Sequence, residues 1–353
     1  MINKELLYSL LIYGGTFITS CYCVYMTKHK TFKGLFSLLA VIIPSITAAF
    51  RECGIDFEAY KSMYINIRNG TGYENIEPLW YQLNRIMPSY EWLLFVSAFL
   101  FLGMAYLGIC LILEKDRWLA WFIMLAVCYS TFYNGMRQML AVSFVFAAIA
   151  LMHRKKLLLG LVLIVIAYFF HKSAIFMLVV PIYLFISKRV KYIEGIVAFL
   201  TFFCIVGLPA ITAFLRDIGM YTGYLEEIRW RLSLSFLLYA LPPIIPYYFF
   251  RPNFSDDNKT LSLCFDLYLL IIPFQFLGMS INYADRVMLY FQIFITVLIP
   301  LMIIEVNKDS TKNYLKPMYI LWFLFHYTVL NILLEGQGTY PYMDFNFSQG
   351  VYQ

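Results

Sequence analysis

The chain has 353 residues, of which 61% are hydrophobic and only 14% charged, and its formal net charge is +6. Soluble globular domains carry about 25% charged residues, so this composition excludes that class and indicates a polytopic membrane protein. No soluble linker, internal repeat or low-complexity tract interrupts the sequence. We therefore predict one all-α membrane domain over residues 1–353.

A membrane-spanning helix needs about 20 consecutive apolar residues, and windows of about that length predict twelve such helices. They cover residues 5–26, 34–50, 92–113, 117–134, 136–152, 157–170, 173–187, 192–214, 232–250, 261–281, 286–304 and 317–335. Two neighbouring windows are short, and His171 and Lys172 separate them. We interpret this polar pair as a turn, because merging the two helices would reverse the assigned side of every later connection.

Alternating the connections across the bilayer gathers 16 of the 27 basic residues on one side. The positive-inside rule makes that side cytoplasmic. Both termini then lie outside, together with two long segments, 51–90 and 215–231.

The basic residues of the two sides differ in type. Eight of the eleven outer basic residues are arginine, against four of the sixteen on the cytoplasmic side. Attraction to anionic headgroups gives no reason for this difference, because either cation satisfies it. The planar fork of arginine binds phosphate or carboxylate at two points, so we predict phosphate binding at the outer face. The alternative is that these arginines only pair with the outer acidic residues.

The outer segment 51–90 is dense in both charged and aromatic residues, and loops of this length are usually functional or disordered. Two apolar series in it have helical spacing: Tyr60, Tyr64 and Ile67, then Leu79, Trp80 and Leu83. We therefore expect ordered, short amphipathic helices on the membrane surface. The tail 336–353 is short and polar enough to fold back over the outer face.

The sequence gives no sign of a metal site. Its seven cysteines form no CxxC pair and no His/Cys cluster. The pair Asp256-Asp257 falls on the cytoplasmic side, and Glu226-Glu227 lies close to Arg229. We interpret both pairs as solvated charge and expect neither a metal nor another cofactor.

Six short motifs follow one another on the outer side of the chain. They are Arg51-x-x-Gly54-x-Asp56, Glu77-Pro78-Leu79-Trp80, Asn134-Gly135-Met136-Arg137-Gln138, His171-x-Ser173-Ala174, Arg286-x-x-x-Tyr290 and Tyr340-Pro341-Tyr342. Their order and spacing resemble the EpsG family of polysaccharide polymerases, which includes Wzy-type O-antigen and capsule polymerases. The resemblance implies a GT-C-like glycosyltransferase architecture with a cavity on the outer face of the bacterial plasma membrane.

The resemblance also implies a reaction. Such a polymerase passes a glycan from undecaprenyl diphosphate to a sugar hydroxyl of another lipid-linked unit. Its partners are lipid-linked glycans and membrane lipid, with a chain-length regulator protein as a further candidate and no nucleic acid. Negative charge grows on the departing diphosphate, and preorganised cations stabilise it. The residues expected to bind diphosphate are Arg51, Arg137, Arg286, Lys172, Gln138, Tyr290 and Tyr342.

Three of these residues lie at the boundaries of apolar windows. Arg137 and Arg286 each begin a window, and Arg51 follows one. Each could instead anchor its helix by snorkelling to the interface. Asp285 offers Arg286 another partner, although adjacent residues of a helix do not face each other.

The acceptor hydroxyl needs a general base that is close and mostly ionised. Asp56 is the first candidate, and its alternative role is an ion pair with Arg51. Glu77 is the second, and its alternative role is to cap the helix that Pro78 begins. His171 is the third candidate, as a base, a phosphate donor or a turn residue.

Three other functions compete with polymerisation. A ligase that moves finished glycan onto a lipid core shares the chemistry but not the motif order. A flippase for lipid-linked oligosaccharide should carry charges along the middle of its helices, whereas here the titratable residues lie at helix ends. A passive membrane subunit that binds a chain-length regulator would keep polymer synthesis after loss of Arg137 alone.

Overall fold

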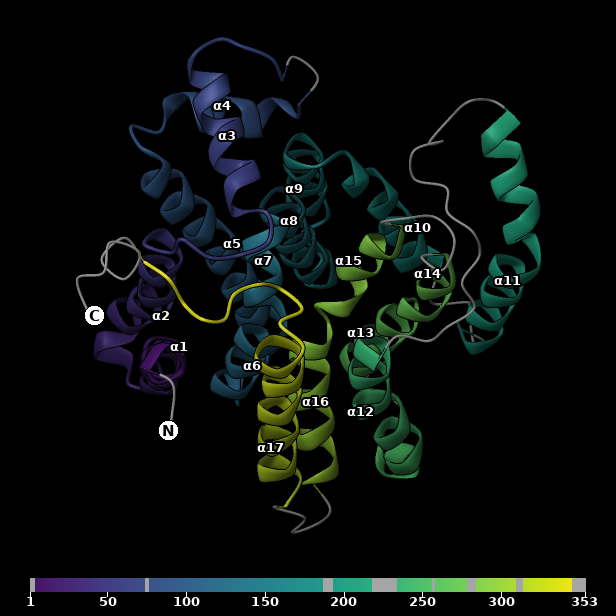
Figure 1. Cartoon of the computed structure of the whole chain (residues 1–353). Helices are drawn as coiled ribbons and strands as arrows, with labels where there is room; N and C mark the ends of the chain where they lie inside the picture. The colour runs from purple at the N-terminus through teal and green to yellow at the C-terminus, as the bar shows by residue number, and fades with distance from the viewer. Residues whose placement is uncertain are drawn as a thin grey trace. The chain divides into compact units, whose positions relative to one another are not determined.

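The computed structural model describes residues 4–73, 76–186, 193–217, 234–255, 258–277, 284–308 and 314–344. All regular structure in these ranges is helical, and the only strand-like feature in them is an isolated backbone bridge between Arg51 and Asp344. The predicted all-α fold is therefore confirmed for this part of the chain (Figure 1).

The helices follow one another closely along the chain. Their bounds are α1 Lys4–Met26, α2 Lys33–Ala49, α3 Phe57–Arg68, α4 Pro78–Ile86, α5 Tyr90–Ile112, α6 Arg117–Met124, α7 Ser130–Asn134, α8 Met136–His153, α9 Leu157–Phe170, α10 Val179–Ile186, α11 Ile193–Asp217, α12 Leu234–Phe250, α13 Lys259–Leu269, α14 Ile271–Leu277, α15 Leu289–Gln292, α16 Ile295–Val306 and α17 Leu315–Tyr327. Two π-helical segments, Leu125–Tyr129 and Thr328–Leu333, and a 3-10 helix, Lys172–Leu178, extend this series.

Every predicted apolar window contains helix, and the structure supports a polytopic membrane protein. In the described ranges, six helices are long and apolar enough to cross a membrane. They are Lys4–Met26, Lys30–Ala49, Tyr90–Ile112, Met136–His153, Lys259–Leu277 and Arg286–Val306. Four further apolar helices are shorter, so the count of twelve spans stays a prediction.

The chain packs as two compact units. The first contains residues 1–178 together with 314–353, and the second contains 179–313. The first unit is built around α8, whose side chains are buried along almost its whole length. A Cβ on Gly108 of α5 would meet the Phe146 ring at 2.4 Å, and one on Gly160 of α9 would meet Met152 at 2.5 Å. These two glycines let α5 and α9 approach α8 closely. Small residues at helix–helix contacts are typical of packing in membrane proteins.

The predicted outer segment 51–90 forms two short helices in its described residues, 51–73 and 76–90, as its apolar spacing predicts. Its two helices are α3, which buries Tyr60, Tyr64 and Ile67, and α4, which buries Trp80 and Leu83. The Tyr60 and Trp80 rings meet edge to face with centroids 5.7 Å apart. The apolar spacing thus forms a joint core between the two helices.

Arg51 lies at the start of this segment, and its side chain is only 1% exposed. Its guanidinium donates to the Cys53 carbonyl at 2.8 Å and to the Tyr133 carbonyl at 3.1 Å, and it lies 4.0 Å from the centre of the Tyr133 ring. A buried cation is tolerated only when its donors are satisfied. Arg51 therefore links the outer segment to the end of α7.

The described part of the C-terminal tail folds back onto the same place, as predicted. Gly54 N–H donates to the Gly338 carbonyl at 2.8 Å, and the Asn134 amide donates to the Gln337 carbonyl at 2.7 Å. The Tyr342 hydroxyl donates to the Thr47 carbonyl at 2.9 Å. Residues 345–353 lie outside the described ranges, and so does most of the predicted outer segment 215–231.

The second unit contains its own buried carboxylate. Glu305, which is 2% exposed, pairs with Lys308 at 2.8 Å and accepts hydrogen bonds from the Ser255 N–H at 3.1 Å and the Asn258 amide at 2.7 Å. It fixes the end of α16 to the connection between α12 and α13.

Replacing Arg51 is expected to destabilise the fold. Arg51→Ala removes a charged donor from two buried carbonyls and should cost about 3 kcal/mol or more. Arg51→Lys keeps the charge but loses the planar fork, so it should rescue poorly. Thermal unfolding in detergent measures both against Arg85→Ala, an exposed arginine of α4. Equal midpoints for the Arg51 and Arg85 variants would contradict this role.

Gly54→Ala is expected to disturb the same junction. Gly54 has φ +116, and a Cβ there would lie 2.9 Å from Arg51 Nη1 and 3.0 Å from Asn134 Oδ1. Gly70 also has a positive φ, +71, but a Cβ there meets nothing within 4 Å. Gly70→Ala therefore measures the backbone cost alone, about 1 kcal/mol. The thermal midpoint should fall further for Gly54→Ala, and matched midpoints would show that the close approach is unimportant.

Candidate active site

The candidate site is centred on Glu77, which immediately precedes α4. Its backbone is extended, and Pro78 at the first helical position begins the helix with a preset φ. The Glu77 side chain makes no capping hydrogen bond to α4. Glu77 occupies the N-cap position without a side-chain capping bond, and its carboxylate, in a residue only 6% exposed, binds other segments instead.

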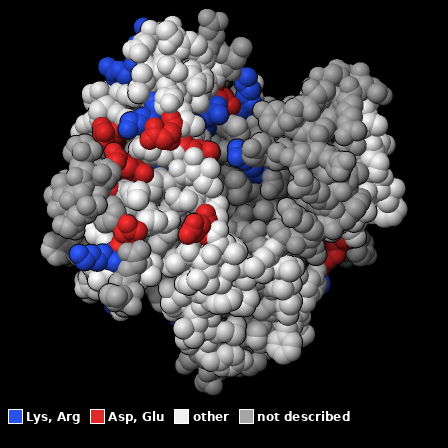
Figure 2. All heavy atoms as spheres, viewed as in Figure 1, with Lys and Arg blue, Asp and Glu red and all other residues white. Residues whose placement is uncertain are grey.

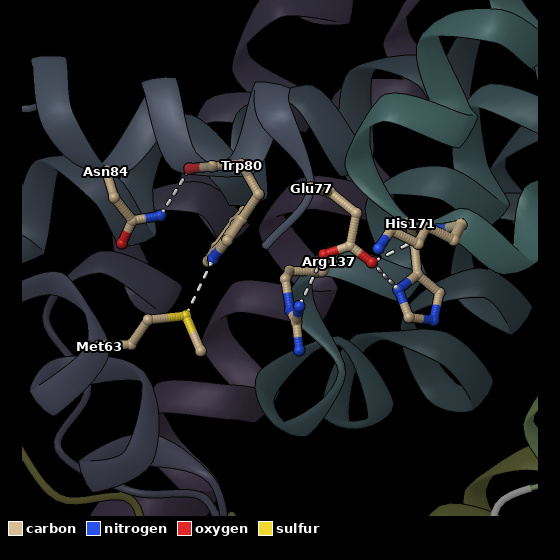
Figure 3. A network of polar contacts seen from close by, with 7 residues as sticks. Met63, Glu77, Trp80, Asn84, Arg137 and His171 are labelled. Atoms are coloured by element: carbon tan, nitrogen blue, oxygen red, sulfur yellow. Dashed lines mark hydrogen bonds and ion pairs between the residues drawn. The ribbon is translucent and has the colours of Figure 1, made fainter. Parts of the chain in front are cut away.

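Three groups from distant segments bind this carboxylate (Figure 3). Arg137 Nη1 donates to Oε2 at 2.7 Å, and His171 Nδ1 lies 3.1 Å from Oε1. The backbone N–H of Lys172 donates to Oε1 at 3.4 Å. In Figure 3 the arginine and the imidazole approach the carboxylate from different sides.

These contacts decide the charge of Glu77. Burial raises the pKa of this carboxyl, but the hydrogen bond to His171 and the charge of Arg137 outweigh burial and lower the pKa to about 2. Glu77 is thus a permanent anion near neutral pH. A carboxylate with so low a pKa is a weak base, because efficient general bases have a pKa near the operating pH.

Arg137 is the second residue of α8, directly after the break between α7 and α8 at Gly135. This break makes Met136 the start of α8, and the N-terminus of a helix carries a positive partial charge. The Arg137 side chain is 28% exposed, so part of it faces solvent while Nη1 is held by Glu77. The position therefore offers cationic donors that are both fixed and accessible.

Asp56 and Tyr60 adjoin this group. The Asp56 N–H donates to Asn134 Oδ1 at 3.3 Å, which fixes the half-buried Asp56 beside the α7–α8 break. Burial raises the pKa of the Tyr60 phenol, the charge and hydrogen bond of Arg137 lower it, and the charge of Asp56 raises it slightly. Tyr60 thus lies within electrostatic reach of both Arg137 and Asp56.

The structure separates the predicted diphosphate-binding residues into groups. Arg137 and Lys172 belong to the Glu77 site, and Lys172 is exposed. Arg51 does not, because its guanidinium is buried against backbone carbonyls, and the predicted alternative of an Arg51–Asp56 ion pair is absent from the described part of the chain.

The remaining predicted residues are mostly buried. Gln138 is 4% exposed, and the Tyr342 hydroxyl is occupied by the Thr47 carbonyl. In the second unit, Tyr290 is fully buried, whereas Arg286 is exposed in the 3-10 helix Ala284–Met288. Of the four predicted cations, Arg51 is buried, whereas Arg137 is partly exposed and Lys172 and Arg286 are exposed.

Figure 2 shows that charged side chains gather on the part of this face formed by α3 and α4, next to a broad uncharged surface. The two short helices carry the exposed Glu58, Arg68 and Arg85. The candidate site thus lies in segment 51–90 and at the ends of α8 and α9.

Sequence reasoning assigned Tyr60 only to an apolar helix face and missed its position beside Arg137. One signal was available, because Tyr60 follows Asp56 by four residues and lies in the first turn of α3, which begins directly after Asp56. Within the described ranges, no group of three or more His, Cys, Asp or Glu side chains is placed to hold a metal ion.

The fold and this site define an all-helical, polytopic membrane protein with a buried carboxylate that binds cationic and imidazole groups at helix ends. The chain belongs to the EpsG family, which matches it over residues 34–343. That family is associated with Wzy-like polymerases, so the protein is a membrane protein of the polysaccharide-polymerase type. Neither the curated proteins nor the solved structures give a match.

The lowered pKa of Glu77 predicts a pH-dependent contribution to stability. The folded pKa of about 2 lies below the ordinary value of 4.5. The ionised group therefore stabilises the fold by about 3 kcal/mol above pH 4.5, and this contribution is lost as pH falls from 4.5 towards 2.

Thermal unfolding of the wild type and Glu77→Gln tests this. The difference between their midpoints should shrink as the pH falls from about 4.5 towards about 2. Glu58→Gln, at an exposed position of α3, should match the wild type throughout. If the wild type keeps the same lead in unfolding midpoint over Glu77→Gln in strong acid, the pKa of Glu77 is not lowered.

Proposed function

We propose that the protein polymerises oligosaccharide repeat units of an O-antigen or capsule. In this reaction a glycan leaves undecaprenyl diphosphate and joins a sugar hydroxyl of a second lipid-linked unit, on the outer face of the bacterial plasma membrane. The observation that carries the proposal is the Glu77 carboxylate, which holds a partly exposed arginine and a partly exposed histidine side by side.

The leaving group explains the need for Arg137. As the bond between the anomeric carbon and the phosphate oxygen breaks, negative charge grows on the lipid diphosphate. A cation that is already oriented stabilises that charge more than water does, because it does not have to reorganise during the reaction. Glu77 supplies the orientation by fixing one end of the guanidinium at 2.7 Å.

Lys172 and Arg286 supply further accessible charge in this proposal. Lys172 is exposed beside His171, and its backbone N–H donates to Glu77, so this lysine adjoins the Glu77 site in the chain. Arg286 begins an apolar span, as Arg137 does, and its exposed guanidinium is a second candidate for the diphosphate. Arg51 instead stabilises the loop that carries Asp56.

The acceptor side of the reaction involves Asp56, Glu77 and His171. Asp56 is half-buried on the loop fixed by Asn134 and suits a hydrogen bond to acceptor hydroxyls. Glu77 is buried and engaged by three donors, so it cannot approach a substrate directly. The imidazole of His171 is 27% exposed and is available to the acceptor.

The proposed outer location rests on charge asymmetry. The positive-inside rule assigns the lysine-rich connections to the cytoplasm, and the segment with α3 and α4 falls on the opposite side. With the diphosphate neutralised by arginine and lysine, the proposed reaction needs no divalent cation.

The distribution of charge favours a polymerase over a flippase. In the described part of the chain, Glu77 precedes α4, Arg137 is the second residue of α8 and His171 follows α9. A transporter needs polar groups along the middle of its spanning helices. A site at helix ends instead suits chemistry at one face of the membrane.

Replacing Arg137 is expected to abolish most polymer synthesis. Truncation of an arginine that holds a partly buried diphosphate costs about 2–5 kcal/mol, so Arg137→Ala should lower synthesis by tens- to thousands-fold. Arg137→Lys should rescue poorly, because it loses the two-point fork. Arg85→Ala is the matched control.

The measurement uses purified protein in nanodiscs with lipid-diphosphate-linked repeat units, with and without EDTA. A ladder of products on a gel should form in both conditions. If Arg137→Ala is well folded and still makes the full ladder, the diphosphate assignment is wrong. If folded wild type gives no ladder with matched substrate, a flippase, a ligase or a subunit role replaces polymerisation.

A further inference from the structure

We infer that His171 is the general base for the acceptor hydroxyl and that Glu77 is its positioning residue, an assignment that rests on the proposed function. It differs from the expectation drawn from the sequence, in which Asp56 was the first candidate. The evidence is the geometry of the Glu77–His171 contact and the exposure of each partner.

The contact fixes which nitrogen of the imidazole can accept a proton. Glu77 Oε1 lies 3.1 Å from His171 Nδ1, and an ionised carboxylate can only accept hydrogen bonds. Nδ1 of the neutral ring must therefore carry the hydrogen. The second nitrogen, Nε2, is left with a free lone pair, because the hydrogen bond of one ring nitrogen decides the state of the other.

The local structure holds this arrangement in place. His171 ends α9, and its N–H donates to the Ala167 carbonyl at 2.9 Å, while the next residue, Lys172, donates its own N–H to Glu77. The carboxylate of Glu77 is bound through both oxygens, so it cannot rotate away from the imidazole. The ring is thus oriented by a group that is itself fixed.

The exposures assign different roles to the two residues. The Glu77 side chain is 7% exposed, whereas those of His171 and Arg137 are 27% and 28% exposed. Of these three residues, the histidine and the arginine can therefore reach a substrate, and the carboxylate cannot. Since they bind the two oxygens of one carboxylate, a hydroxyl at His171 and a diphosphate at Arg137 would lie next to each other.

The reaction step follows from this arrangement. The acceptor hydroxyl gives its proton to His171 Nε2 as its oxygen forms a bond to the anomeric carbon of the donor glycan. The bond from that carbon to the phosphate oxygen breaks, and the lipid diphosphate leaves with the electron pair. Glu77 stabilises the resulting imidazolium, Arg137 stabilises the diphosphate, and the imidazolium then returns its proton to water.

Asp56 suits this step less well. Its side chain makes no capping hydrogen bond to α3, and the contact that fixes it to Asn134 is through its backbone N–H. A base must be held in line with the proton that it removes. We therefore assign to Asp56 the binding of acceptor hydroxyls.

The first test measures the tautomer and does not depend on activity. Magic-angle-spinning NMR of protein with isotope-labelled histidine distinguishes protonated Nδ1 from protonated Nε2, and comparison with His171→Gln assigns one of the four histidines. At a pH where the ring is neutral, His171 should carry its hydrogen on Nδ1. In Glu77→Gln this preference should weaken. A wild-type hydrogen on Nε2 would overturn the inference.

The second test measures catalysis. His171→Gln should lower kcat by about 10²- to 10⁴-fold, with little change in the KM for the acceptor. Asp56→Asn should mainly raise that KM. His29→Gln replaces an exposed histidine that is distant from His171 in the sequence, and it should behave as wild type. If folded His171→Gln keeps wild-type kcat, or if Asp56→Asn loses kcat instead, the assignment of the base is wrong.

The two tests separate this inference from the proposed function. If the wild type makes polymer and the His171→Gln variant is equally active, His171 is not the general base, but the protein is still a polymerase. A wild type without any activity on matched substrate refutes the polymerase, and with it the base, even where the NMR experiment finds the hydrogen on Nδ1.

Discussion

The burial of one anion, Glu77, organises the site. A buried carboxylate is costly unless hydrogen-bond donors and opposite charge surround it. Glu77 meets this requirement with Arg137, His171 and the backbone of Lys172, which come from the start of α8 and the end of α9. These segments are far apart in sequence from α4. The contacts that neutralise the Glu77 carboxylate thus bring together the groups that the proposed chemistry needs. The side chains of Arg137 and His171 remain partly exposed.

A second buried charge, Arg51, stabilises the surroundings of the site by the opposite means. Its cation is compensated by backbone carbonyls and an aromatic ring, and no part of it remains accessible. Gly54 leaves space for the guanidinium, and Asn134 links the adjoining backbone at Asp56 to the Gln337 region of the tail. The backbone of the loop bearing Asp56 is therefore tied to α7 and to the tail by hydrogen bonds.

The two arginines differ in function because their environments differ, although both belong to similar short motifs. The pairing of Arg137 with a carboxylate fixes one end of its fork, and its side chain stays 28% exposed. Arg51 is buried, and its Nη1 and Nη2 groups donate to carbonyls of the protein itself. A glycosyl transfer from a lipid diphosphate requires the first kind of arginine, since the charge to be stabilised arrives with the substrate.

The sequence by itself determined the membrane class, the helical fold and the order in the outer segment, because apolar length and helical spacing are local properties of the chain. It also brought Glu77, Arg137 and His171 into the candidate set, because charged residues at the ends of apolar helices are few. Only the tertiary structure decided that Glu77 binds both Arg137 and His171, that Arg51 is buried, and that Tyr60 lies beside Arg137. Those facts depend on contacts between residues 60 to 95 positions apart, and no local pattern specifies such contacts.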